Sequence, residues 1–384
     1  ANDSLLIIVA DLRAKVIGEG ENLWLTQAGR IEAARSGVRL NTDAIDNSAG
    51  VDSSDHEVNI KILCTEAMRR KDLPSGERNS LLASMTDKVA EHVLAHNYSQ
   101  TGALSLAQQS AVQDHGAFER LMVRLEGRGV LDRQVEGLPS TAEMTQFAED
   151  GRPLTRPEIA VLMAWTKIVL FDDLVGSDVP DDPYFEATLQ GYFPDALHQY
   201  PDAMAAHRLK REVISTVLAN RIIDLAGPVA MLRLREQTGA SNARIVAAFE
   251  TALALFGVSD LKAQIDALDN QVPADSQLAL HAGMADALRR LTHAIVAEQS
   301  SDPIEAQIAR RGDANDALQA LRIDDLPAYE KAVLTRRIKN FARNDVPQDL
   351  AKRVAQLSYM TTAPRITKLA AQTDKSAAIS AHDY

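Results

Sequence analysis

Residues 18–22, with the sequence GEGEN, form the first of two short segments whose side chains could do chemistry. The glycines let the backbone approach a bound ring closely, and the amide of Asn22 can donate and accept hydrogen bonds at once. The loop is not the complete dinucleotide fingerprint, because Leu23 stands where the third glycine is expected. A tight turn that binds no ligand explains these residues as well as a cofactor site does.

Residues 41–57, NTDAIDNSAGVDSSDHE, form the second segment and are mostly polar or acidic. The side chain of Asn47 could pair with a carboxamide, and Ser54 with the following amides at a helix N-terminus could receive a carboxylate. The alternative is a solvated loop followed by an ordinary N-cap at Ser54 or Asp55. Both interpretations predict that a helix begins at this point.

The elements that must position these segments alternate between strands and helices. Short apolar runs at residues 5–9, 15–17 and 38–40 are typical of strands, and Thr26 can cap a helix that ends at Arg35. Both polar segments follow such a strand, which is where α/β sheets bind ligands. The unit that receives a pyrophosphate needs about thirty residues, and only seventeen precede the glycine loop. We therefore expect this chain to be the C-terminal piece of a longer protein, with much of the active site upstream.

Strand patterns disappear after about residue 75, and apolar residues recur at helical spacing from there onward. Thr155, Pro157 and Glu158 form a capping pattern that predicts a core helix through about Phe171. We predict a mainly α fold. Residues 1–75 would be the C-terminal part of a Rossmann-like α/β coenzyme domain, and residues 76–384 would form a large all-helical domain.

Composition narrows the functional classes. The net charge of −12 disfavours nucleic acid and anionic membrane surfaces as partners. Cys64 is the single cysteine, so no intrachain disulfide can form, which is consistent with a reducing compartment such as the cytoplasm. No apolar run reaches the roughly 20 residues that span a bilayer.

Three histidines and one basic cluster have simpler explanations than a site. His92 and His96 have a spacing that can hold zinc, but no third ligand is evident in the sequence, so we predict no metal. His56 could be a general base, but we expect it to flank the helix start. We interpret the basic residues at 208–211 as a solvated helix face.

Several runs resemble the large bacterial NAD-dependent glutamate dehydrogenases. The N-terminal runs are KVIGEGENL, LTQAGRIE and LNTDAIDNSAGVDSSDHEVNIKIL, and the later ones are LTRPEIAVLMAWTKIVL, DVPDDPYF and GYFP. They occur in the family's order and span most of the chain. GEGEN and DNSAGVDSSDHE are also similar, more distantly, to segments of ordinary glutamate dehydrogenases.

The resemblance implies roles for five residues. Gly20, Asn22 and Asn47 would lie on the nicotinamide side of NAD, while Val51 and Ser54 would line the glutamate pocket, with Ser54 donating to a substrate carboxylate. The chain departs from the family pattern at two positions that are usually glycine, which here are Glu21 and Trp24. In the family, the pyrophosphate loop and the catalytic lysine and aspartate belong to upstream segments, so no catalytic residue is assigned here.

The implied reaction is oxidative deamination of L-glutamate to 2-oxoglutarate and ammonium. We expect the complete enzyme to be a homo-oligomer and this chain alone to be inactive. The other hypothesis is a helical interaction or regulatory module that binds no ligand of its own.

Overall fold

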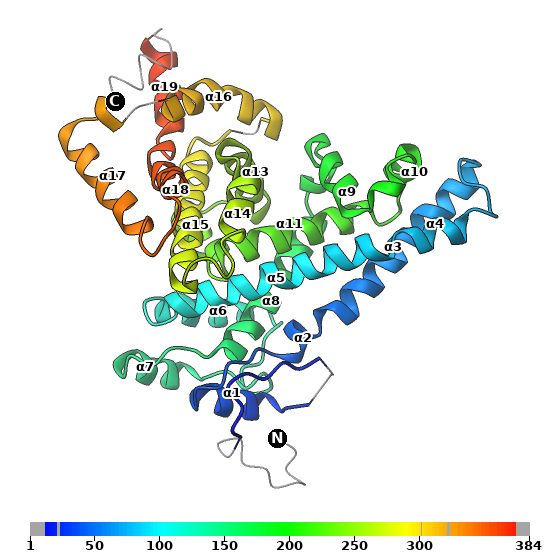
Figure 1. The fold of residues 1–384 in the computed structure, drawn as a ribbon, viewed down its shortest axis with the longest axis horizontal. Helices are drawn as coiled ribbons and strands as arrows, with labels where there is room; N and C mark the ends of the chain where they lie inside the picture. The colour runs from blue at the N-terminus through cyan, green and yellow to red at the C-terminus, as the bar shows by residue number, and fades with distance from the viewer. Residues whose placement is uncertain (1–11, 21–23, 301, 321–322, 374–384) are drawn as a thin grey trace. The chain divides into compact units, whose positions relative to one another are not determined.

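The computed structural model describes residues 12–20, 24–300, 302–320 and 323–373. Within these ranges the chain is mainly helical and contains no β-strand, which confirms the predicted mainly α class (Figure 1). The chain divides into two compact units, Ala1–Val229 (unit 1) and Ala230–Tyr384 (unit 2). The domain boundary expected near residue 75 would separate a coenzyme domain from a helical domain. The division into compact units does not test that boundary, which stays a prediction.

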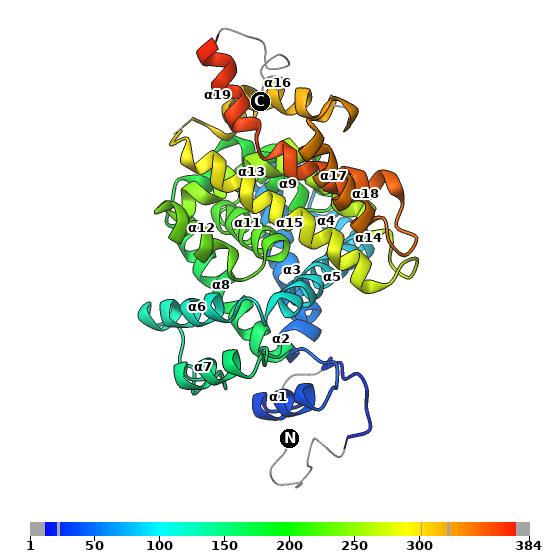
Figure 2. The ribbon, with the colours of Figure 1, turned by 90° about the vertical axis from the view of Figure 1, so that its left-hand side faces the viewer.

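Unit 1 is built around the long helix α5, which packs against α3, α8 and α11; Figures 1 and 2 show α3 and α5 side by side. Its α-helices are α1 (Gln27–Arg35), α2 (Asp43–Asp46), α3 (Ser48–Arg70), α4 (Arg78–Ser84), α5 (Thr86–Ser110), α6 (His115–Gly127), α7 (Thr141–Glu149), α8 (Arg156–Val175), α9 (Glu186–Tyr192), α10 (Pro201–Ala205) and α11 (Lys210–Ala226). Short 3-10 helices lie between α8 and α10, namely η3 (Val179–Asp181), η4 (Pro183–Phe185) and η5 (Asp195–Leu197).

Two predicted helix starts are confirmed. The hydroxyl of Thr26 accepts a hydrogen bond from the Gly29 amide at 3.2 Å and caps α1. The Glu158 carboxylate accepts from the Thr155 amide at 2.6 Å, which closes the capping pattern at the start of α8. Much of α8 is buried, as the sequence predicted, including Ile159, Leu162, Met163 and Leu170. Its apolar surface therefore serves as a core element of unit 1.

The strands predicted at residues 15–17 and 38–40 do not form, so that prediction is wrong. A single parallel bridge joins Val16 to Arg39, with Ile17 N donating to Arg39 O and Arg39 N donating to Lys15 O, both at 2.9 Å. Among the described residues no strand lies beside this bridge, and a lone pairing of this kind is at best marginally stable. The strand expected at residues 5–9 lies outside the described residues.

Unit 2 is a set of helices with a largely aliphatic interior. Helix α13 packs against α15 and α16, α17 packs against α18, and α16 packs against α19. The helices are α12 (Ala230–Thr238), α13 (Asn242–Phe256), α14 (Val258–Asp266), α15 (Ala274–Ala297), α16 (Ile304–Ala320), α17 (Ala328–Phe341), α18 (Gln348–Met360) and α19 (Ala363–Thr373), with the 3-10 helix η6 (Ile323–Asp325).

The apolar helices are core elements. No single helix in the described ranges is long and apolar enough to cross a membrane. The bent pair α11 and α12 passes that test of length and composition only when the two helices are taken together. Both helices bury aliphatic side chains inside the protein, for example Ile222 and Leu234.

Candidate functional site

Asn47 lies at the junction between α2 and α3, where it is the C-cap residue of one helix and the N-cap residue of the next. Its side chain rests against Gly50: a Cβ at position 50 would come within 3.0 Å of Asn47 Oδ1. That distance is tighter than ordinary van der Waals contact, so the position of the Asn47 amide depends on the glycine. The polar segment therefore holds one defined carboxamide at the start of a long helix.

Val51 and Ser54 lie on an exposed face of α3, with Val51 75% exposed. The predicted N-cap at Ser54 or Asp55 is wrong, because α3 already begins at Ser48. Ser54 Oγ instead donates to the Gly50 carbonyl at 3.2 Å. A serine hydroxyl inside a helix can be satisfied by the carbonyl four residues back, so it does not have to end or begin the helix. The Ser54 hydroxyl is nevertheless accessible from outside.

The described part of the glycine loop, residues 18–20, is held by its buried acid, Glu19. The Glu19 carboxylate accepts hydrogen bonds from Arg30 Nε at 2.6 Å and Nη2 at 2.8 Å, and from the Leu25 amide at 3.3 Å. Gly20 is exposed, and a Cβ there would meet nothing within 4 Å. Open space therefore borders Gly20 as far as the described residues are concerned. The predicted residue Asn22 and its neighbour Glu21 lie outside the described residues, whereas Trp24 is 60% exposed.

The two predicted segments are brought together by Asp46. The Glu19 amide donates to Asp46 Oδ2 at 3.0 Å, and Asn41 Nδ2 donates to Asp46 Oδ1 at 2.7 Å. Arg30 also forms an ion pair with Asp43 at 3.0 Å. Burial opposes the charge of Arg30, but the hydrogen bonds and charges of Glu19 and Asp43 outweigh it and raise the pKa of Arg30. The glycine loop, α1 and α2 thus form one ionic network.

Two residues that sequence reasoning missed extend this network to other helices. Arg156 Nε, at the start of α8, donates to Asn41 Oδ1 at 2.9 Å. Asn97 Nδ2, on α5, donates to the Ile45 carbonyl at 2.8 Å and to Ser48 Oγ at 2.9 Å. No local pattern marks either residue, because each reaches a partner about fifty or more positions away.

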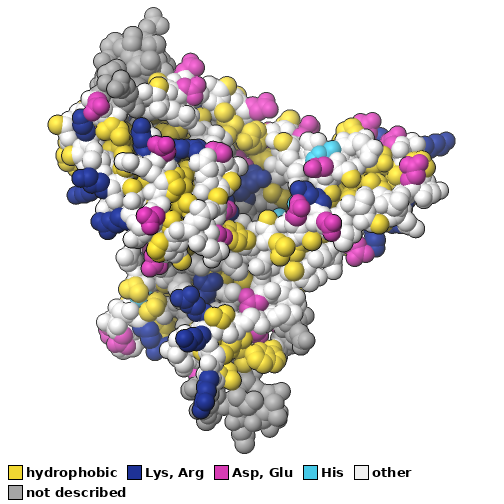
Figure 3. All heavy atoms as spheres, in the orientation of Figure 1, with side chains coloured by type: hydrophobic (Ala, Val, Ile, Leu, Met, Phe, Trp, Pro, Cys, Tyr) yellow, Lys and Arg dark blue, Asp and Glu magenta, His cyan; other side chains and the backbone are white. Residues whose placement is uncertain are grey.

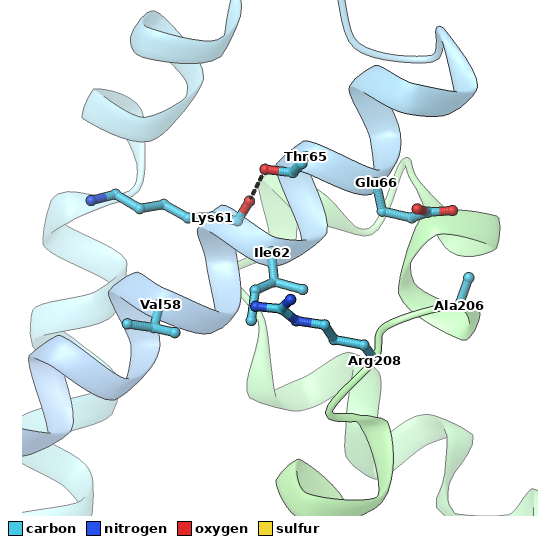
Figure 4. Close-up of a pocket in the computed structure, with 7 residues that line it drawn as sticks. All are labelled: Val58, Lys61, Ile62, Thr65, Glu66, Ala206 and Arg208. Atoms are coloured by element: carbon cyan, nitrogen blue, oxygen red, sulfur yellow. Dashed lines mark hydrogen bonds between the residues drawn. The ribbon is translucent and has the colours of Figure 1, made fainter.

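A groove of about 430 Å³ lies further along the exposed face of α3 that carries Val51 and Ser54. Figure 4 shows Arg208 reaching from the segment after α10 toward Ile62 of α3. The charged groups of α3 in this groove are already paired on the same helix, Lys61 with Glu57, and Glu66 with Arg69 and Arg70. One face of α3 therefore stays accessible over several turns.

The three histidines considered in the sequence gather in one place. His56 is fully buried in α3, so the expectation that it flanks the helix start is wrong. Its ring centroid lies 5.7 Å from that of His92 and 5.8 Å from that of His96, both on α5. Burial lowers the pKa of His56. Burial would raise the pKa of Asp52, but the hydrogen bond and charge of His96 outweigh burial and lower it.

The fold and site define a helical protein in which a glycine loop and a carboxamide-bearing helix junction are joined by a buried ionic network. A family model described as the C-terminal region of glutamate dehydrogenase matches residues 151–384, and a model of the catalytic domain of bacterial NAD-glutamate dehydrogenase matches residues 1–107. The chain belongs to the family of bacterial NAD-specific glutamate dehydrogenases, which confirms the resemblance stated from the sequence.

Three relatives are named NAD-specific glutamate dehydrogenase. The protein of Halomonas elongata is 41% identical over 376 residues, which is 98% of this chain and 23% of the relative. The proteins of Pseudomonas aeruginosa and Mycobacterium tuberculosis are 40% and 35% identical, each over 94% of this chain and 22% of the relative. The chain thus spans less than a quarter of the length of these relatives.

Proposed function

We propose that this chain is part of an NAD-dependent glutamate dehydrogenase that oxidatively deaminates L-glutamate to 2-oxoglutarate and ammonium. The observation that carries the proposal is the hydrogen bond from the Glu19 amide to Asp46, which holds the glycine loop beside the junction that bears Asn47. Val51 and Ser54 follow within the first two turns of α3 and are exposed to a ligand. The family membership supports the same reaction.

Gly20, Asn22 and Asn47 would contact the nicotinamide side of the cofactor, and the open space beside Gly20 fits the approach of a ring. Bound NAD supplies the hydride acceptor. The residues of this chain would orient the reactants: Asn47 with its carboxamide, Val51 by apolar contact and Ser54 by donating to a glutamate carboxylate. A misplacement of about 1 Å can cost about a hundredfold in rate, so positioning groups are sufficient to matter.

The segment before α3 would be the edge of a Rossmann-like sheet in the longer protein. This proposal rests on the family resemblance, since the described residues contain one isolated parallel bridge, between Val16 and Arg39, and no strand. Residues 76–384 would form the helical domain that braces the catalytic region or mediates homo-oligomer assembly. The face in Figure 3 shows basic side chains interspersed with acidic ones, and together with the net charge of −12 this disfavours nucleic acid and anionic membranes as partners. The single cysteine, Cys64, is consistent with a cytoplasmic enzyme.

The test uses the longer enzyme, with the 384-residue chain alone as a reference that we expect to be inactive. Ser54→Ala should remove one charge-assisted hydrogen bond and lower kcat/KM for glutamate by roughly ten- to a hundredfold, with little change in the KM for NAD. Asn47→Ala should impair NAD use first. Ser54 does not cap the helix, and alanine is a good helix former. Ser54→Ala should therefore not reduce thermal stability.

Ser53→Ala is the matched control. Ser53 is also exposed on α3, and its hydroxyl donates to the carbonyl four residues back, that of Ala49 at 2.6 Å. Its replacement should leave both kinetic constants unchanged. If Ser54→Ala behaves like Ser53→Ala, Ser54 does not bind the substrate; if the chain alone turns over glutamate, the upstream segments are not required.

A further inference from the structure

Two pairs of potential metal ligands face each other between α3 and α5, apart from the residues assigned to glutamate and NAD. Asp52 and His56 lie one turn apart on α3, and His92 and His96 lie one turn apart on α5. His96 Nδ1 is 2.8 Å from Asp52 Oδ2, and His56 Nε2 is 3.7 Å from Asp52 Oδ1. Ligand pairs spaced one turn apart on facing helices are how helical bundles build metal sites.

His56 lacks the partners that the other buried histidines have. Its side chain is fully buried, and neither ring nitrogen has a hydrogen-bond partner among the described residues. His115 places its two nitrogens 2.6 Å from the carbonyls of Val112 and Arg152, and His207 bonds at both nitrogens as well. A buried polar group without a partner is costly. The exception therefore points to a ligand at His56.

We propose that Asp52, His56 and His96 bind one divalent transition-metal ion, with Zn²⁺ the ion that their nitrogen and oxygen donors fit best. One donor atom from each residue lies within 4.8 Å of the other two. Tetrahedral zinc with ligands at about 2.1 Å places its donors about 3.4 Å apart. The 3.7 Å between His56 Nε2 and Asp52 Oδ1 is close to this value, whereas the 2.8 Å between His96 Nδ1 and Asp52 Oδ2 is a hydrogen-bond distance that the bound ion would lengthen.

The surroundings hold His56 in place and leave room for a fourth ligand. Tyr192 stacks on the His56 ring with centroids 4.4 Å apart, and its hydroxyl is held by Asn59 at 3.0 Å and Asp55 at 3.1 Å. Such outer contacts orient a metal-binding imidazole. A hollow of about 470 Å³ is lined by all three histidines, so water or His92 can complete the coordination.

The ion would fasten the first turns of α3, which carry Val51 and Ser54, to α5. The sequence alone does not predict this arrangement. The spacing of His92 and His96 indicates two ligands on one helix, whereas Asp52 and His56 come from another helix, α3. This inference rests on the geometry of the cluster and does not depend on the proposed dehydrogenase function.

The experiment measures metal bound to the untagged 384-residue chain. After treatment with a chelator and its removal, the chain should bind one Zn²⁺ in equilibrium dialysis. Co²⁺ in the same site should give the intense visible absorption of tetrahedral cobalt. Asp52→Asn and His96→Ala should each weaken binding by at least about a hundredfold, since removing a mere outer-shell partner of a metal ligand already costs about 10- to 100-fold.

His96 is half exposed, so its replacement should leave the fold intact, which circular dichroism checks. His281→Ala is the matched control, because His281 also pairs with an aspartate, Asp266 at 3.2 Å, but belongs to no three-ligand group among the described residues. It should retain one tightly bound Zn²⁺. Absence of stoichiometric Zn²⁺ binding by the unmodified chain, or equal losses in His96→Ala and His281→Ala, would overturn the proposal.

Discussion

The ionic network that joins the glycine loop to α1 and α2, and the helix pair α13 and α15, both contain buried groups, but of opposite kinds. In the ionic network the buried groups are charged: Glu19 is 1% exposed and Arg30, on α1, is 6% exposed, and they pair with each other. In α13 and α15 the buried groups are mostly aliphatic or aromatic, and Phe249 and Leu288 are fully buried.

The two kinds of burial have different consequences. Apolar contact stabilises in proportion to the area removed from water and has little directional preference. A buried ion pair contributes less net stability, because desolvation offsets much of the attraction, but its hydrogen bonds allow only one arrangement of the partners. We infer that the core of unit 2 provides stability, whereas the ionic network fixes the position of the glycine loop relative to α1 and α2.

The largest expected effect is on the apolar core. Phe249→Ala should lower the free energy of unfolding by about 3 to 5 kcal/mol, because it removes a buried ring and leaves a cavity. Phe249→Leu, which keeps most of the volume, should cost clearly less, about 1 kcal/mol. Chemical denaturation followed by circular dichroism measures both. Below the unfolding temperature, kcat/KM of the longer enzyme should hardly change.

A substitution in the ionic network should affect both the free energy of unfolding and the position of the glycine loop. Arg30→Met keeps the aliphatic stem but leaves the Glu19 carboxylate buried without its charged partner, at a cost of about 3 kcal/mol. The displaced glycine loop should also lower kcat/KM in the longer enzyme, which Phe249→Ala does not do.

The double variant Glu19→Gln with Arg30→Met is the control, because it removes both charges and should recover part of the lost stability. It should not recover the kinetics if the network sets the loop position. Unchanged kcat/KM in Arg30→Met would show that the ionic network does not set the position of the glycine loop. The network and the core of α13 and α15 would then not differ in their effect on catalysis.

The same contrast explains which features could be predicted from the sequence. The starts of α1 and α8 depend on partners within three residues of Thr26 and Thr155, so local patterns predicted them. The predicted cap at Ser54 or Asp55 puts the start of α3 too late, because Ser54 is a residue type that caps helices but its hydroxyl bonds backward inside the helix.

The features that escaped prediction depend on tertiary pairing. The bond between Arg156 and Asn41 spans 115 positions, and the one between His96 and Asp52 spans 44. Each side chain is visible in the sequence, but its partner is selected only when α3, α5 and α8 pack. The proposed roles of Gly20, Asn22, Asn47, Val51 and Ser54 rest on family resemblance, and the kinetics of Asn47→Ala and Ser54→Ala test two of them.

The smallest expected effect concerns His207, a titratable side chain that forms hydrogen bonds inside unit 1. His207 is buried and uses both nitrogens in its neutral form: Nε2 bonds to the Asn59 carbonyl at 3.1 Å, and Nδ1 accepts from the Leu209 amide at 3.2 Å. Burial lowers the pKa of His207 below its ordinary 6.5, although the bond to Asn59 opposes this. Below pH 6.5 the unfolded chain therefore binds more protons than the folded one.

The contribution of His207 is accordingly complete above pH 6.5 and is lost as the pH falls from there toward the folded-state pKa. Within that window the slope is at most about 1.4 kcal/mol per pH unit. His207→Gln can donate to Asn59 and accept from Leu209 but does not titrate, so its free energy of unfolding should fall less between pH 7.5 and 5.5, by about 1 kcal/mol. Urea unfolding across this range measures the difference. Parallel pH profiles for the variant and the unmodified chain would assign the acid sensitivity to other groups.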